Sequence, residues 1–150
     1  MAHTITEACI GCGACKKVCP NLAITGELKS LHYIDAAKCI DCSVCGMTCT
    51  KEAVLDQNGK VVPRIKIADR MKPIVNKQEC SACFLCADFC RVNAIKISEP
   101  TYRGDLNTYA EINFTKCVGC GLCASNCPMG AITMGKVEKP AVAAKENAVA

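Results

Sequence analysis

The chain has 150 residues, and 51% of them belong to the hydrophobic set that includes cysteine. When the 16 cysteines are set aside, 60 hydrophobic residues remain, 19 of them alanine, with no tryptophan. So few bulky side chains cannot fill the cores of two ordinary domains. Residues 1–8 show no charged segment before an apolar stretch, and no run of about 18 apolar residues follows. We therefore expect a cytoplasmic protein without membrane insertion.

The cysteines fall into four runs, each spaced C-x2-C-x2-C-x3-C, and no run lacks a member. The runs are Cys9, Cys12, Cys15 and Cys19; Cys39, Cys42, Cys45 and Cys49; Cys80, Cys83, Cys86 and Cys90; and Cys117, Cys120, Cys123 and Cys127. This spacing is typical of [4Fe-4S] ligation, in which the fourth cysteine of a run binds the neighbouring cluster. Two-residue gaps let a loop present three thiolates to one cube, and the three-residue gap carries the fourth away. We therefore expect the runs to work in pairs.

Other uses of cysteine fit this spacing poorly. Structural zinc needs one closed tetrahedral set per ion and leaves the third cysteine of each run without a role. A dense disulfide framework is typical of secreted chains, whereas a reducing compartment favours metal binding. Thioredoxin-like redox chemistry needs a single C-x-x-C motif.

A second repeat accompanies the cysteines, because a small residue and a β-branched one stand four and five positions after each fourth cysteine. These pairs are Ala23-Ile24, Ala53-Val54, Ala94-Ile95 and Ala131-Ile132. Each pair predicts the start of a strand after a short helix. Residues 3–7 and 73–77 predict short strands that open two modules. Residues 34–39 match residues 112–117, which makes the second and fourth runs equivalent.

The stretches CIGCGACKKVCP, YIDAAKCIDCSVC and CVGCGLCASNCPMGAI carry a family resemblance. Residues 1–59 resemble a bacterial, clostridial-type 2[4Fe-4S] ferredoxin, and residues 72–135 resemble a second copy in tandem. The resemblance implies an α+β fold of two ferredoxin-like dicluster modules. Each module is then a pseudo-twofold pair of strand-helix-strand repeats around two cubane clusters. We expect residues 60–71 to form a linker and edge strand, and residues 136–150 a mobile C-terminal tail.

The resemblance also implies four [4Fe-4S] clusters and their ligands. These are Cys9, Cys12, Cys15 and Cys49; Cys39, Cys42, Cys45 and Cys19; Cys80, Cys83, Cys86 and Cys127; and Cys117, Cys120, Cys123 and Cys90. A nested pairing of the first run with the fourth and of the second with the third stays open. Proline follows the fourth cysteine at Pro20 and Pro128, whereas Thr50 and Arg91 depart from the family pattern. The separate opening and closing strands of each module favour the tandem pairing.

Three connecting segments are less specific. Asn58-Gly59 predicts a two-residue hairpin. Residues 60–73 carry five basic residues and one acid, which indicates a solvated edge strand or, alternatively, a docking strip for an acidic partner. The polar segment 98–108 predicts a loop.

The charge of the bound clusters changes the meaning of the basic composition. The chain alone has a formal charge of +4, and four thiolate-bound clusters of about −2 each make the loaded protein acidic. Nucleic acid is therefore not an expected partner, and no aromatic platform supports one. Loop glycines at the first and fourth runs favour easier reduction there, and Asp41 predicts the least easily reduced cluster.

No catalytic residue is predicted. The sequence has no phosphate-binding glycine motif, and we interpret His3 and His32 as ordinary surface or strand residues. We expect electron transfer as the iron–sulfur subunit of a larger anaerobic oxidoreductase, similar to those of tungsten or molybdenum aldehyde or formate oxidoreductases, hydrogenases or carbon monoxide dehydrogenase. Its partners would be a catalytic subunit and a redox donor or acceptor, either a ferredoxin or a flavin subunit. The alternatives are a freely diffusing polyferredoxin and, less favoured, an assembly or scaffold protein that stacks on itself.

Overall fold

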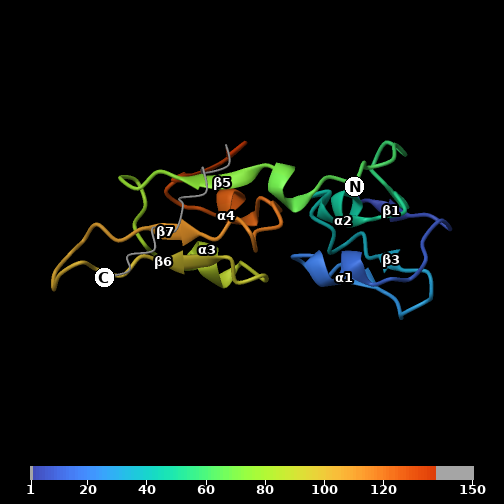
Figure 1. Cartoon of the computed structure of the whole chain (residues 1–150), viewed down its shortest axis with the longest axis horizontal. Coiled ribbons are helices and arrows are strands. Elements are labelled where there is room, and N and C mark those ends of the chain that lie inside the picture. The colour runs from blue at the N-terminus through green and yellow to red at the C-terminus, as the bar shows by residue number, and fades with distance from the viewer. Residues whose placement is uncertain (1, 138–150) are drawn as a thin grey trace, which may run out of the picture.

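The computed structural model describes residues 2–137, in two halves joined by a linker (Figure 1). The first half contains β1 (Thr4–Ile5), α1 (Ala14–Val18), β2 (Ile24–Thr25), β3 (Tyr33–Ile34), α2 (Val44–Thr48) and β4 (Val54–Leu55). The second half contains β5 (Lys72–Val75), α3 (Leu85–Asp88), β6 (Ile95–Ile97), β7 (Ala110–Ile112), α4 (Leu122–Ser125) and β8 (Ile132–Gly135). Each half thus runs strand, helix, strand, strand, helix, strand.

The strands of each half pair in the same way. The first pairs with the last, and the two middle strands pair with each other, always antiparallel. The predicted strands after each fourth cysteine are confirmed, since β2, β4, β6 and β8 begin at the expected β-branched residues. The strands of the first half have two residues each, whereas β5 and β8 have four.

All four helices are short and follow a residue in the left-handed conformation. Each contains the third cysteine of its run, and the fourth cysteine lies at the helix end or just beyond it. Helices of four or five residues are unstable in isolation. Their stability must come from the groups that they contact.

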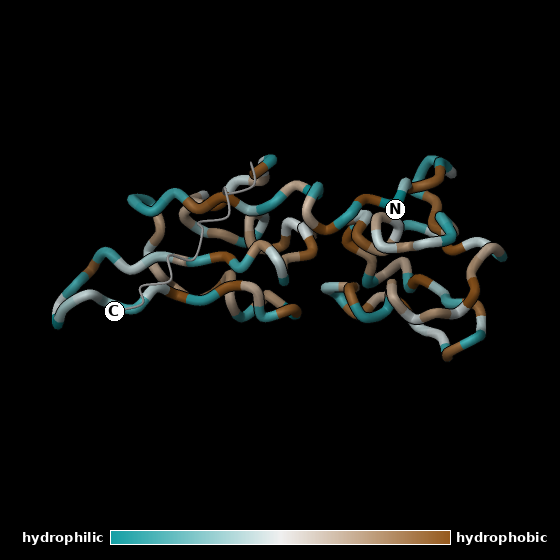
Figure 2. Tube along the Cα trace, viewed as in Figure 1, coloured by the Kyte–Doolittle hydropathy of each residue, from teal (hydrophilic) through white to brown (hydrophobic). Residues whose placement is uncertain are grey.

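The core is small and contains cysteine. In the first half Ile24, Cys45 and Val54 are buried together. In the second half the buried cluster consists of Cys86, Ile95, Ala110, Cys123 and Ile132. Figure 2 shows the hydrophobic residues as short stretches in both halves. This agrees with the expectation that hydrophobic packing alone contributes little.

The hairpin after β4 differs from the two-residue prediction. Asp56 N–H donates to Lys60 O at 2.8 Å and Gly59 N–H to Asp56 O at 3.0 Å, which leaves a three-residue loop. Gly59 has φ 75°, as expected after a type I turn. The returning chain makes one bridge, between Leu55 and Val61, and no strand.

The linker is also different from the predicted solvated edge strand. It forms the 3-10 turn η1 (Ile67–Asp69), and Arg70 and Lys72 are buried rather than solvated. Segment 98–108 is a loop, as predicted. The predicted mobile tail lies outside the described residues from residue 138 onward. Among the described residues, no helix is long and apolar enough to cross a membrane.

Candidate iron–sulfur sites

The structure gathers the sixteen cysteines around four hollows that open to solvent, and each spans between 320 and 380 Å³ free of protein atoms, part of it open solvent. The cysteines at site one are Cys9, Cys12, Cys15 and Cys49; at site two, Cys19, Cys39, Cys42 and Cys45; at site three, Cys80, Cys83, Cys86 and Cys127; and at site four, Cys90, Cys117, Cys120 and Cys123, where Cys86 of site three also lines the hollow. All sixteen are free thiols. Each hollow therefore combines three cysteines of one run with the fourth of the other run in the same half.

The loop between the first and third cysteines of each run has one backbone shape. The residues two and four positions after the first cysteine have positive φ in every run, at Gly11 and Gly13, Asp41 and Ser43, Ala82 and Phe84, and Gly119 and Gly121. In this loop Gly11 N–H donates to the Cys9 sulfur at 3.4 Å. A non-glycine residue in this conformation costs about 1 kcal/mol. The runs with side chains here therefore accept strain that the glycine runs avoid.

The structure explains why alanine recurs four positions after the fourth cysteine of a run. Ala23, Ala53 and Ala94 are buried, and their N–H groups donate to the sulfur of the fourth cysteine at 3.3, 3.4 and 3.3 Å. A hydrogen bond from a backbone N–H favours the thiolate. The repeat thus places a small residue where the strand begins and a donor where a ligand sulfur lies.

The electrostatics of the hollows indicate a cationic occupant. Burial, with smaller contributions from the neighbouring Cys9, Cys12 and Cys49, raises the pKa of the Cys15 thiol to about 11. Burial likewise raises the pKa of Cys45 and of Cys123 to about 12. Four such thiols ionise together only around positive charge, and a coordinating thiol is deprotonated outright. Soft thiolate sets of this kind suit iron–sulfur clusters, so the residues fit the expected group.

Site two has a polar contact that sequence reasoning missed. His3 is 4% exposed and lines this hollow. Its Nδ1 lies 2.5 Å from Asp41 Oδ1, and neither atom has another partner among the described residues. Its Nε2 lies 3.0 Å from Ser43 Oγ. The interpretation of His3 and His32 as ordinary surface or strand residues was wrong, since both precede a strand and are buried.

Two buried cations, one at the end of the linker and one at the start of β5, also contact the cysteine loops. Arg70 is 4% exposed and donates from its guanidinium to four oxygens, those of Ile65 O at 3.0 Å, Met47 O at 2.9 Å, Thr48 Oγ1 at 3.0 Å and Val118 O at 3.2 Å. Lys72 is 3% exposed, and its Nζ donates to Cys117 O. Burial lowers the pKa of both groups. The basic run alone gave no signal that two of its members would be buried.

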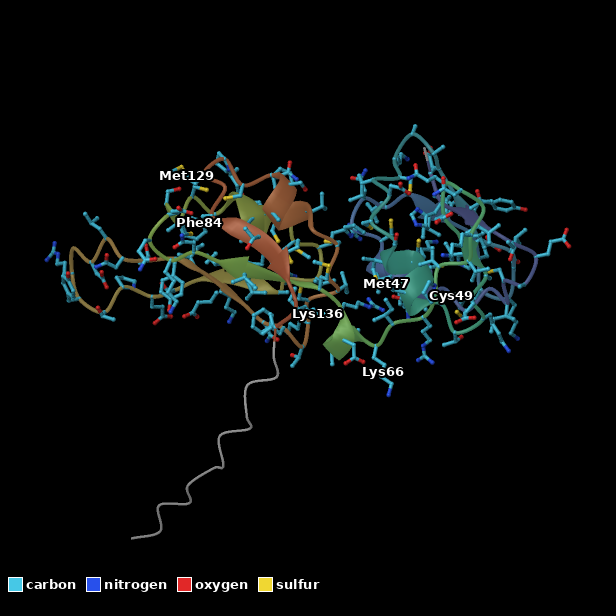
Figure 3. All side chains as sticks on the ribbon, turned by 90° about the horizontal axis from the view of Figure 1, so that it is seen from above. Met47, Cys49, Lys66, Phe84, Met129 and Lys136 are labelled. Atoms are coloured by element: carbon cyan, nitrogen blue, oxygen red, sulfur yellow. The ribbon has the colours of Figure 1, made fainter. Side chains whose placement is uncertain are left out.

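The four sites differ in their exposure to solvent. Cys12 of site one and Cys83 of site three are exposed, whereas Cys42 and Cys120, which hold the same place in their runs, are partly buried. Exposed hydrophobic residues accompany the exposed cysteines, with Ile10 beside Cys12 and Phe84 beside Cys83. In Figure 3, Phe84 lies in the second half beside Met129, and Met47 lies in the first half near the junction.

Comparison with known proteins places this cysteine arrangement in a family. Residues 79–131 match the 4Fe-4S dicluster domain, and residues 2–25 match the 4Fe-4S binding domain. Ferredoxin-1 of Chlorobaculum tepidum is 38% identical over 61 residues, which cover 37% of this chain and 97% of that protein. The chain belongs to the 4Fe-4S ferredoxin family. Ferredoxin 7Fe of Hydrogenibacillus schlegelii is 40% identical over 60 residues, 39% of this chain and 76% of that ferredoxin.

A longer relative shares more of this ferredoxin-family chain. The polyferredoxin protein MvhB of Methanothermobacter marburgensis is 31% identical over 97 residues, 62% of this chain and 22% of that protein. A chain of the formate dehydrogenase–heterodisulfide reductase–formylmethanofuran dehydrogenase complex of Methanospirillum hungatei gives a TM-score of 0.37 and 24% identity, over 85% of this chain and 52% of that one. The two family matches and the polyferredoxin relative identify the protein as a polyferredoxin-like iron–sulfur protein. Its cofactors are four [4Fe-4S] clusters, and it serves in electron transfer.

Proposed function

We propose that each half is a self-contained two-cluster module, with residues 1–59 and 72–135 as the modules and 60–71 as the linker. The four cysteines of each hollow are then the four ligands of one cluster. The identical order and pairing of strands in the two halves support a pseudo-twofold arrangement of strand-helix-strand repeats. The match of one dicluster domain to residues 79–131, which contain the third and fourth runs, supports tandem rather than nested pairing.

Double substitutions test the pairing by counting iron. Cys9→Ser and Cys49→Ser remove ligands of the same cluster under tandem pairing, so the double variant loses about four Fe, no more than either single variant. Cys9→Ser combined with Cys127→Ser is the matched control and loses about eight Fe, because two clusters are affected. Under nested pairing these two results are exchanged. Iron and acid-labile sulfide analysis of anaerobically purified protein decides between them.

We further propose that the chain is the iron–sulfur subunit of a larger anaerobic oxidoreductase. It would connect a catalytic subunit with a redox donor or acceptor, such as a ferredoxin or a flavin subunit. Each cluster, once bound, accepts and returns one electron. The observation that carries the subunit role is the exposed hydrophobic side chain beside each exposed ligand cysteine, Ile10 at Cys12 and Phe84 at Cys83. Such patches are typical of protein interfaces, and dense reduced thiols favour a cytoplasmic location.

Purification from native anaerobic extract tests the subunit role. We expect recovery in a large complex with a flavin, pterin or nickel subunit, whereas a lone species of 15.9 kDa would support a freely diffusing polyferredoxin. Phe84→Ser should reduce recovery of the complex because it removes part of the interface. Tyr102→Ser is the control, since Tyr102 is equally exposed on the loop remote from the sites. Equal recovery with both variants would contradict the role of the Phe84 surface.

A further inference from the structure

Residues 70–72, where the linker ends and β5 begins, are in contact with residues 117–119 of the fourth run. Arg70 donates to Val118 O, and Lys72 donates to Cys117 O. Between them, a Cβ added to Gly119 would lie 2.6 Å from Met71 O, so the two backbones approach closely. Three consecutive residues at the end of the linker and the start of β5 therefore contact the loop that carries the first two cysteines of site four.

The same guanidinium reaches the second run in the other half. Arg70 Nη2 donates to Met47 O at 2.9 Å and to Thr48 Oγ1 at 3.0 Å. Both acceptors belong to α2, the helix that follows Cys42. Met47 O also accepts from Ile65 N–H at 3.0 Å, which ties the linker to the same helix. One buried side chain thus joins α2, the linker and the site-four loop. Figure 1 shows the linker running between the two halves.

We infer that Arg70 is a positioning residue that holds site two against site four across the junction, so that the four sites lie in the order one, two, four, three. The inference rests on the proposed ligand sets. It differs from the order of the runs along the chain.

Burial within each half agrees with this order. Cys15 of site one packs against the buried core of the first half around Cys45 of site two. Cys86 of site three and Cys123 of site four are buried together in the second half. Across the junction, Arg70 donates both to Met47 O of the run that carries Cys42 and to Val118 O of the run that carries Cys120.

Exposure identifies the ends of the row. The second cysteine of the run is exposed only at sites one and three. At sites two and four the equivalent cysteines, Cys42 and Cys120, are partly buried. The runs that carry these two cysteines are the ones to which Arg70 donates. Sites one and three are therefore the two places where an electron-transfer partner reaches a ligand cysteine directly.

Substitution of Arg70, which removes its guanidinium, tests the inference. Arg70→Met keeps most of the buried volume but removes all five donors, and Arg70→Lys keeps the charge but not the planar fork. Arg64→Met is the matched control, because Arg64 is an exposed linker arginine. The readout is the electron paramagnetic resonance spectrum of the fully reduced protein, with iron and sulfide measured on the same sample.

We expect Arg70→Met to retain the iron and sulfide of the unmodified protein. Its spectrum should lose the line broadening that arises from magnetic coupling between clusters of the two halves. Arg70→Lys should recover it only in part, and Arg64→Met should leave the spectrum unchanged. Full broadening in Arg70→Met, or equal loss in Arg64→Met, overturns the inference while the iron content still supports the proposed function. An unmodified protein without clusters would instead contradict the proposed function.

A second measurement needs no junction variant and applies if Arg70→Met does not fold. A dissolved gadolinium chelate should accelerate spin relaxation at two of the four reduced sites. Ligand variants Cys12→Ser and Cys42→Ser identify the signals of sites one and two. Acceleration at sites one and three supports the order, whereas acceleration at site two or four overturns it.

Discussion

Sites two and four are built from equivalent cysteine runs, yet the side chains beside them carry opposite charge. At site two the loop carries Asp41, whose carboxylate contacts buried His3. At site four the equivalent loop residue is Gly119, and buried Lys72 contacts Cys117 O, in addition to the Arg70 guanidinium that both sites share. In the strand register, the position of His3 is taken in the second half by the buried ring of Pro73.

This difference shows how one ligand pattern can hold clusters of different potential. A negative charge close to a site disfavours the addition of an electron, and a positive charge favours it, most strongly where water is excluded. The cysteine spacing cannot distinguish the two sites. The residues around them therefore predict that site four is reduced more easily than site two.

Removal of iron and sulfide should have the largest effect, because it should abolish the fold of both halves and with it the difference between sites two and four. The cores are small and the helices too short to persist alone, so we expect the iron-free chain to lose its fold. Circular dichroism and amide hydrogen exchange would follow the loss. Residual protection should be confined to the four-residue pairing of β5 with β8. Native-like protection of the first half without iron would contradict this prediction.

Gly119→Ala should destabilise site four more than Gly121→Ala. Both glycines have φ 77°, so each alanine costs about 1 kcal/mol in backbone strain. Only at Gly119 would the added Cβ meet the Met71 carbonyl, and nothing lies within 4 Å at Gly121. The rate of iron release in denaturant measures the difference. Equal rates would show that the close approach of linker and loop is unimportant.

Lys72→Met should lower the reduction potential of site four, because it removes a buried positive charge beside Cys117. Potentiometric electron paramagnetic resonance measures the shift. Lys66→Met is the control, since Lys66 points away from the ribbon in Figure 3 and its charge is screened by water. A shift of equal size in both variants would argue against a local effect.

Asp41→Asn should raise the lowest potential in the protein by a smaller amount. Asp41 is 30% exposed and pairs with His3, so its charge is partly compensated. Asparagine tolerates the left-handed conformation that this position requires, with φ 58°. Glu27→Gln removes one negative charge from an exposed loop and serves as the control. An unchanged lowest potential would refute the assignment of site two as the least easily reduced.

The smallest effect concerns the loop between β6 and β7, which the first half replaces with a shorter turn. Hydrogen bonds from the Thr101 hydroxyl and from the N–H groups of Thr101 and Asn107 lower the pKa of Asp105 to about 2. Because the pKa of Asp105 is lowered in the folded state, its carboxylate stabilises the loop fully at pH values above the ordinary pKa of 3.8. This stabilisation is lost as the pH falls through about 2. Thr101→Val should move the pKa of Asp105 back toward 3.8, as carboxyl NMR titration would show. An unchanged titration would contradict the hydrogen-bond assignment.

The sequence alone predicted much of the fold, because its strongest signals are local. Gaps of two and three residues determine how a loop can surround a cluster, and the repeated pair such as Ala23-Ile24 marks where the chain becomes a strand. The predicted length of the hairpin loop was wrong because Asn58-Gly59 is compatible with both a two-residue and a three-residue loop. Only the hydrogen bond from Asp56 to Lys60 distinguishes them.

Tertiary structure alone decided which residues surround the cysteines. His3 lies 40 residues from Ser43 in the chain, and Arg70 lies 48 residues from Val118. No local pattern reports such contacts, and a basic run looks the same whether its members are solvated or buried. The sequence thus determined what the protein can bind, because ligand chemistry depends on residue type and short spacing. Folding determined which sites are neighbours and which are exposed, because both depend on contacts between distant segments.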